Sequence, residues 1–135
     1  MHDSPHNDPS LLAYKQCRRA GHALDNERVA GKSYDEAFEA MLTTGRVWDA
    51  TNPSSDRGVA IKLRWCVLDL QNGELNELAD TLREFFRMRN KAGGDWLRDL
   101  RTHIEIVKRV APECEYAVEC LKSILAGMAK PVMLN

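Results

Sequence analysis

The fold is decided by the stretch Asn52-Pro53-Ser54-Ser55-Asp56-Arg57-Gly58-Val59-Ala60-Ile61-Lys62-Leu63-Arg64-Trp65-Cys66-Val67-Leu68-Asp69-Leu70. A proline-serine loop passes here into a helix whose apolar residues lie on two sides. At about 100° per residue, one side holds Val59, Leu63, Cys66, Val67 and Leu70, and the opposite side holds Ile61, Trp65 and Leu68. A helix that is apolar on both sides has to be covered on both sides. We therefore expect an all-α fold in which the two-faced helix near residues 59–71 is central.

Two helices are expected before this stretch. Ser10 is a suitable N-cap for a helix over residues 11–29. Ser33 and Glu36 have the spacing of a capping box, which begins the second helix. The apolar stripes of the two helices are Ala13, Cys17, Ala20 and Leu24, and then Tyr34, Ala37, Phe38, Met41 and Trp48. Gly45 lies on the second stripe, where we interpret it as room for a close neighbour, since glycine otherwise disfavours a helix interior.

The dipeptide Asn72-Gly73 leaves two alternatives open after the central helix. The stripe Leu75, Leu78, Leu82, Phe85 and Phe86 continues one apolar face, which favours a single helix over residues 59–91. The other apolar face stops at Gly73, which favours a break, and the break is the alternative that we favour. Asp95 is a suitable cap for the next helix, and Pro112 suits the first turn of the last one.

These segments predict a single-domain bundle of five or six mostly antiparallel helices. Residues 1–9 are polar and interrupted by proline, so we expect a flexible tail followed by one helical domain over residues 10–130. Residues 131–135 are expected to form a second tail. No stretch has the alternating pattern of a β-strand, and 135 residues are enough to bury one core.

The composition argues against several function classes. Nineteen basic and twenty acidic residues leave a formal net charge of −1, so no global field attracts nucleic acid or an anionic membrane. No apolar run is long enough to span a bilayer, and the N-terminus lacks the apolar core of a signal peptide. We therefore expect a cytoplasmic protein without a membrane partner, in which the four cysteines are thiols.

A sequence resemblance covers residues 48–64, which read Trp48-Asp49-Ala50-Thr51-Asn52-Pro53-Ser54-Ser55-Asp56-Arg57-Gly58-Val59-Ala60-Ile61-Lys62-Leu63-Arg64. This stretch resembles one found in small uncharacterised helical proteins of alphaproteobacteria. In those proteins a tryptophan-bearing helix is followed by proline, small hydroxyl residues, a glycine and a helical Lys-Leu-Arg. Asn52 departs from the pattern, which has a small apolar residue before the proline. The resemblance implies no activity and no site, and it supports a loop-to-helix transition at residues 52–59.

Metal and catalytic chemistry find little support in the residue spacing. Zinc sites use ligand pairs at short fixed spacings, whereas Cys114 and Cys120 lie about 120° apart on a helix. His2 and His6 have a suitable separation but lie in the polar tail. His103 has no partner acid or nucleophile in the sequence, and cysteines on apolar stripes are disfavoured as thiolates. We therefore expect no cofactor and no metal, and we favour a non-enzymatic protein, with an active site assembled across helices as the alternative.

A basic segment offers a nucleic-acid alternative. Arg83, Arg87, Arg89 and Lys91 fall within one short stretch and are able to contact phosphates. Acidic residues stand three or four positions from several of them, which suits local ion pairs on a helix. We therefore favour a solvated face of mixed charge and keep a nucleic-acid-binding accessory protein as the alternative function.

Helix-helix association is the function that we favour from the sequence. Phe85, Phe86 and Met88 are spread over much of the helical wheel and cannot all point into one core. The two-faced helix also needs more cover than two neighbours readily give. Surplus apolar surface on a small helical protein is commonly buried in a dimer or against a partner. We therefore predict a homodimer, or an adaptor or regulator of another protein, that binds through Phe85, Phe86 and Met88.

Overall fold

The computed structural model describes residues 7–30, 34–89 and 95–129. These residues form six helices and no strand, which confirms the all-α class. The helices are α1 (Pro9–Ala30), α2 (Tyr34–Ala50), α3 (Asp56–Asn72), α4 (Asn76–Met88), α5 (Trp96–Val110) and α6 (Glu115–Met128). The predicted roles of Gly31 and Ser33 lie outside the described residues.

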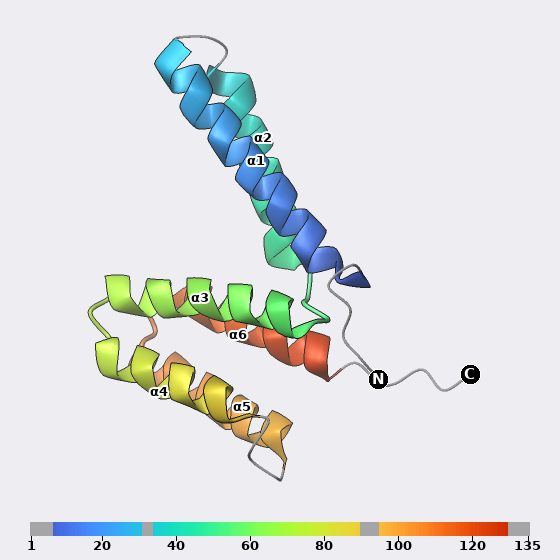
Figure 1. Cartoon of the computed structure of the whole chain (residues 1–135). Helices are drawn as coiled ribbons and strands as arrows, with labels where there is room; N and C mark the ends of the chain where they lie inside the picture. The colour runs from blue at the N-terminus through green and yellow to red at the C-terminus, as the bar shows by residue number, and fades with distance from the viewer. Residues whose placement is uncertain (1–6, 31–33, 90–94, 130–135) are drawn as a thin grey trace. The chain divides into compact units, whose positions relative to one another are not determined.

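The chain divides into two compact units, Met1–Gly58 and Val59–Asn135. The first unit contains the hairpin of α1 and α2, and the second contains most of α3 together with α4, α5 and α6 (Figure 1). Successive helices run in opposite directions within each unit, as the sequence predicts (Figure 1). The single domain over residues 10–130, with tails over residues 1–9 and 131–135, stays a prediction.

The hairpin of the first unit packs through small side chains around one tryptophan. Its buried apolar side chains, among those described in α1 and α2, are Ala13, Leu24 and Trp48. The rings of Tyr14 and Trp48 have centroids 5.4 Å apart. A Cβ added at Gly45 would meet the Sγ of Cys17 at 3.9 Å, which is ordinary van der Waals contact. Gly45 therefore does face a close neighbour, but the space would also admit alanine.

The start of α1 differs from the sequence-based expectation. The helix begins at Pro9, and its N-cap function falls to Asp8 instead of Ser10, because the Asp8 carboxylate accepts the backbone N–H of Ser10 at 2.9 Å. Proline is well suited to the first helical position, where its missing N–H leaves no bond unmade. The prediction that Ser10 is the N-cap is therefore wrong by two residues.

The core of the second unit draws on all four of its helices. Its buried members are Val59, Cys66, Val67, Leu70, Ala79, Leu82, Phe86, Leu100, Ile104, Val107, Ala111, Cys114, Ala117, Val118, Cys120, Leu121 and Ile124. One predicted face of α3 accounts for the first four of these residues. On the opposite face Trp65 packs against the core while Leu68 is 42% exposed, so this face is covered only in part.

The chain breaks between α3 and α4, as favoured from the sequence. Leu75 donates its N–H to the carbonyl of Leu70 at 2.9 Å, and Glu74 donates to Gln71 at 2.9 Å. These two bonds form a Schellman motif, which closes a helix through one residue in the left-handed region. That residue is Glu74, with φ of 62°, and not Gly73.

The two remaining helix starts differ in how well the sequence predicts them. Asp95 caps α5 as expected, since its carboxylate accepts the N–H of Arg98 at 3.0 Å. Pro112 does not open α6, and that prediction is wrong. Instead, Cys114 donates its N–H to the carbonyl of Ala111 at 3.0 Å, and this turn delays the helix until Glu115.

Candidate functional site

The three residues predicted to bind a partner occupy different environments in α4. Phe86 is 2% exposed and belongs to the core of the second unit, whereas Phe85 is half-buried and Met88 is 37% exposed. The rings of Phe85 and Phe86 contact each other edge-on, with centroids 5.4 Å apart. Of the three side chains, Met88 lies most on the surface of this unit, and the predicted role of the set in binding stays a prediction.

Phe85 and Phe86 take part in an aromatic cluster with two residues of α5. Phe85 stacks on Trp96 with centroids 5.2 Å apart, and its centroid is 4.3 Å from that of His103. Burial lowers the pKa of His103, and the carboxylate of Asp99 opposes this effect only in part. A neutral imidazole packed on a phenyl ring suits a structural role better than proton transfer.

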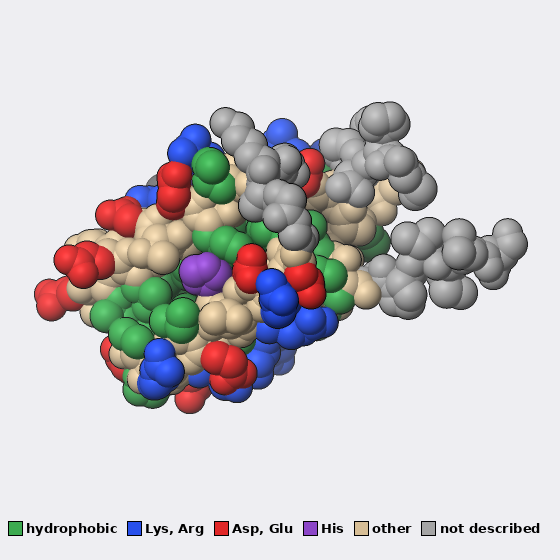
Figure 2. Space-filling view, turned by 90° about the horizontal axis from the view of Figure 1, so that it is seen from below, with side chains coloured by type: hydrophobic (Ala, Val, Ile, Leu, Met, Phe, Trp, Pro, Cys, Tyr) green, Lys and Arg blue, Asp and Glu red, His purple; other side chains and the backbone are tan. Residues whose placement is uncertain are grey.

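Two of the four predicted nucleic-acid residues are paired with acidic neighbours on α4. Nη1 of Arg83 lies 3.0 Å from Oδ1 of Asp80, and Arg87 forms a bidentate ion pair with the carboxylate of Glu84. Arg89 also has an interaction partner, and Lys91 lies outside the described residues. Acidic and basic side chains are intermixed on the face shown in Figure 2. A mixed surface of this kind attracts phosphate backbones only weakly.

The cysteines of the second unit are buried and held as thiols. Burial raises the pKa of the Cys66 thiol, and neighbouring Cys120, Asp69 and Cys114 raise it further. Burial also raises the pKa of Cys114. Thiols of this kind stay protonated at neutral pH and are poor nucleophiles and metal ligands. The part of the chain that the structure describes holds no group of three or more side chains suited to a metal ion. The expected lack of a metal or cofactor stays a prediction.

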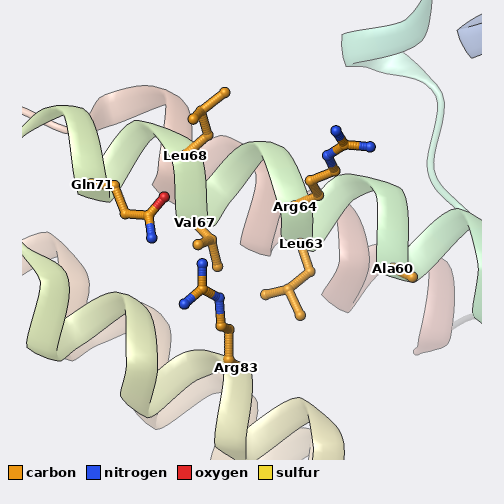
Figure 3. A pocket seen from close by; sticks show the side chains of 7 residues that line it. All are labelled: Ala60, Leu63, Arg64, Val67, Leu68, Gln71 and Arg83. Carbon is orange, nitrogen blue, oxygen red and sulfur yellow. The ribbon is translucent and has the colours of Figure 1, made fainter.

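A groove of about 410 Å³ lies between α3 and α4 (Figure 3). It is lined by Ala60, Leu63, Arg64, Val67, Leu68 and Gln71 of α3 and by Arg83 of α4. The six α3 residues recur every three or four positions and so follow one side of the helix for about three turns. The groove is therefore elongated, with a length of about 16 Å along α3 at a rise of about 1.5 Å per residue.

The α3–α4 groove combines an apolar floor with two arginines. Val67 is buried and Leu63 is half-buried, whereas Leu68 is 42% exposed at the edge. Arg83 reaches from α4 toward Val67, and Arg64 extends from α3 away from α4 (Figure 3). Arg83 is already paired with Asp80, so the positive charge beside this apolar surface is partly neutralised.

A second apolar surface lies on α2 of the first unit. Tyr34, Phe38 and Leu42 follow one another at intervals of four residues and so share one side of the helix. The rings of Tyr34 and Phe38 stack with centroids 5.9 Å apart, although they are 41% and 37% exposed. Asp35 and Glu39, both exposed, directly follow the two aromatic residues. We call Tyr34, Phe38 and Leu42 the α2 stripe.

Both carboxylate oxygens of Asp8 accept hydrogen bonds. Its Oδ1 accepts the N–H and Oγ–H of Ser10 at 2.9 and 2.7 Å, and its Oδ2 accepts the same two groups of Ser55 at 3.0 and 2.6 Å. Burial raises the pKa of Asp8, but these hydrogen bonds outweigh it and hold the pKa below its usual value. A Cβ at Gly58 would collide with this carboxylate. Asp8 therefore joins the start of α1 to the start of α3 as a structural group.

The sequence-based reasoning missed the Asp8 cap, the exposure of the α2 stripe and the burial of Lys62. The order Asp8-Pro9-Ser10 is a recognisable helix start, because an N-cap aspartate precedes proline at the first helical position. The interval of four residues in the α2 stripe is also visible, but the sequence does not tell which apolar residues stay exposed. Lys62, which is 1% exposed and has an interaction partner, carries no local signal of its burial.

Comparisons with known proteins show no relative of this chain. It matches no protein-family model, and no significant match exists among curated proteins or solved structures. The resemblance over residues 48–64 therefore stays an expectation. Within the described residues, no helix is both long enough and apolar enough to cross a bilayer.

Proposed function

We propose that the protein acts through helix-helix contacts and that its working form is a homodimer. The observation that carries the proposal is the exposed α2 stripe, in which two stacked aromatic rings lie on a helical hairpin with a small core. A cytoplasmic location belongs to the same proposal and is supported by the free thiols of all four cysteines.

The hairpin buries little apolar surface for its length. Helices α1 and α2 have 22 and 17 residues, yet Ala13, Leu24 and Trp48 are the buried apolar side chains among those described in them. Burying one large apolar side chain contributes about 1.5–3 kcal/mol, whereas fixing each backbone residue costs about 1–2 kcal/mol in conformational entropy. A surface that covers the α2 stripe would therefore stabilise the hairpin.

The α2 stripe has the composition of an interface anchor. Large aromatic side chains dominate the energetics of protein interfaces, and tyrosine is especially common among the residues that matter most. Closed two-fold dimers are the most frequent way in which a small protein buries such a surface. In this proposal the α2 stripe takes the place of the set Phe85, Phe86 and Met88, because Phe86 lies in the core of the second unit.

Other functions have weaker support. Two of the arginines expected to contact nucleic acid, Arg83 and Arg87, are paired with acidic residues. The pKa values of Cys66 and Cys114 are raised, which disfavours nucleophilic catalysis. We therefore propose a non-enzymatic role and no nucleic-acid role.

The proposal is tested by measuring the mass of the full chain in solution. Light scattering after size-exclusion chromatography should give a dimer for the parent protein. The double variant Tyr34→Gln/Phe38→Gln should be monomeric while keeping its helix content by circular dichroism. Val47→Gln is the matched control, because Val47 is 49% exposed on α2 but lies away from the stripe. A monomeric parent, or a double variant that remains dimeric, would overturn the proposal.

A further inference from the structure

We infer that the homodimer proposed above forms by antiparallel pairing of α2 with α2 of a second copy, so that Arg46 of each copy lies beside Asp35 of the other. The inference rests on that homodimer and adds the direction, the register and the charge contacts of its interface. Two observations carry it, namely the order of charges along one edge of α2 and the position of the apolar stripe relative to them. All of the residues concerned belong to the first unit.

Charged residues are ordered along one edge of α2. At about 100° per residue, Asp35, Glu39 and Arg46 project within about 40° of one another, next to Leu42 of the α2 stripe. All three are exposed, and none of them forms an ion pair with another residue that the structure describes. Asp49 projects from the same side of the helix but already has an interaction partner. This edge is therefore acidic in the amino-terminal half of α2 and basic at Arg46 in the carboxyl-terminal half.

The order of these charges favours an antiparallel pair of helices. In such a pair the amino-terminal half of each α2 lies beside the carboxyl-terminal half of the other, so opposite charges meet at both ends of the contact. A parallel pair would place acidic residues at the same height as acidic residues and Arg46 at the same height as Arg46 of the second copy, which disfavours that direction. Two identical antiparallel helices are related by a two-fold axis, so both copies use the same surface and the contact is closed.

The apolar and the charged residues agree on one register. When Phe38 lies at the height of Leu42 of the second copy, Asp35 lies at the height of residue 45 of the second copy. That position is one residue, or about 1.5 Å along the axis, from Arg46 of the second copy. Glu39 lies about 7.5 Å along the axis from the same arginine, which is within the screening length of about 10 Å at moderate salt. The register that pairs the apolar side chains therefore also pairs the charges.

The size of the contact makes its charges measurable. A single pair of short helices buries less than the roughly 1,600 Å² of a standard stable interface, so we expect a weak dimer with a Kd in the micromolar range. Attraction between exposed charges is screened by salt. The Kd of the parent should therefore rise when NaCl is raised from about 50 mM to about 500 mM, and this tests the contact without any substitution.

The substitutions reverse the charges of the two halves of α2 in the full chain, separately and together. The first variant is Arg46→Glu, the second is Asp35→Lys/Glu39→Lys, and the third combines all three changes. Glu36→Lys is the matched control, because Glu36 is also an exposed acidic residue of the first turn of α2. It projects about 100° from Asp35, in the direction away from the α2 stripe.

Sedimentation equilibrium at low salt should separate these variants. Each of the first two should have a Kd at least about tenfold above that of the parent, because attraction is replaced by repulsion at both ends of the contact. The combined variant should return to within about threefold of the parent, because opposite charges meet again. The control should also stay within about threefold. Circular dichroism checks that every variant keeps the helix content of the parent.

The alternative outcomes separate the two proposals. An Arg46→Glu variant that associates as tightly as the parent would overturn the antiparallel pairing while the homodimer stands. A combined variant as weak as Arg46→Glu would do the same, and so would a parent that associates more tightly at high salt, as a parallel pair should. A monomeric parent would overturn the homodimer and the pairing with it.

Discussion

The carboxylate of Asp69 in α3 caps α6, because its Oδ2 accepts the backbone N–H of Ala117 at 2.9 Å. Cys114 occupies the N-cap position of α6, yet its side chain makes no capping bond. Its Sγ lies instead 3.9 Å from the carbonyl oxygen of Asp69. The end of α3 is thereby joined to the start of α6 by residues that lie more than forty positions apart.

Replacing Asp69 should therefore destabilise the second unit. Asp69→Ala removes the acceptor for the N–H of Ala117, and loss of an N-cap acceptor costs about 1–2 kcal/mol. Urea unfolding followed by circular dichroism should show a decrease of this size in the free energy of unfolding. Asp80→Ala is the control, because its exposed ion pair with Arg83 contributes at most about 0.5–1 kcal/mol. Equal effects of the two changes would contradict the capping role.

The turn between α3 and α4 predicts opposite effects for two neighbouring residues. Glu74 has φ of 62°, a conformation that costs an L-residue about 1–2 kcal/mol, so Glu74→Gly should raise the free energy of unfolding by about 1 kcal/mol. A Cβ at Gly73 would lie 3.1 Å from the Sγ of Cys114, so Gly73→Ala should lower it by about 1 kcal/mol or more. Thermal and urea unfolding measure both changes. Destabilisation by both, or by neither, would contradict this description of the turn.

The same turn shows how far local sequence reasoning reaches. The loss of one apolar face at Gly73 was enough to predict the break, because periodicity is a local property. Glycine is the residue that most readily adopts the left-handed region, yet the residue in that region is Glu74 and not its neighbour Gly73. Gly73 is needed for a different reason, namely the close approach of Cys114, which lies about forty positions away in the sequence. Contacts of this kind depend on tertiary packing.

The candidate surfaces also combine features that are visible in the sequence with features that depend on tertiary packing. The apolar stripe of α2 could be read from its spacing, but the exposure of Tyr34 and Phe38 depends on how much of that stripe α1 covers. The α3–α4 groove needs Arg83 of one helix beside Val67 of another, and no spacing along the chain predicts that neighbour. Phe86 illustrates the opposite case, since its place beside Phe85 suggested surplus surface and the fold buries it.

Phe86 and Met88 should differ sharply in their effect on stability. Phe86 is 2% exposed and contacts the rings of Phe85 and Trp96, so Phe86→Ala should lower the free energy of unfolding by about 3–5 kcal/mol. Met88→Ala should lower it by less than about 1 kcal/mol, because Met88 is 37% exposed. Guanidinium unfolding measures both values. A stable Phe86→Ala variant with weakened self-association would place the ring at an interface and contradict its role in the core.

The pH dependence of stability should reveal Asp8. Hydrogen bonds from Ser10 and Ser55 hold its pKa below the usual value despite burial, so the ionised form stabilises the folded state. This contribution is fully present above the unfolded pKa of about 3.9 and is lost as the pH falls through the lower folded pKa. Asp8→Asn should lower the free energy of unfolding by about 2 kcal/mol at pH 7, because an amide cannot accept from all four donors. Urea unfolding from pH 7 to pH 2.5 should show the parent and the variant converging below about pH 4. A difference that stays constant over this range would mean that the charge of Asp8 does not contribute.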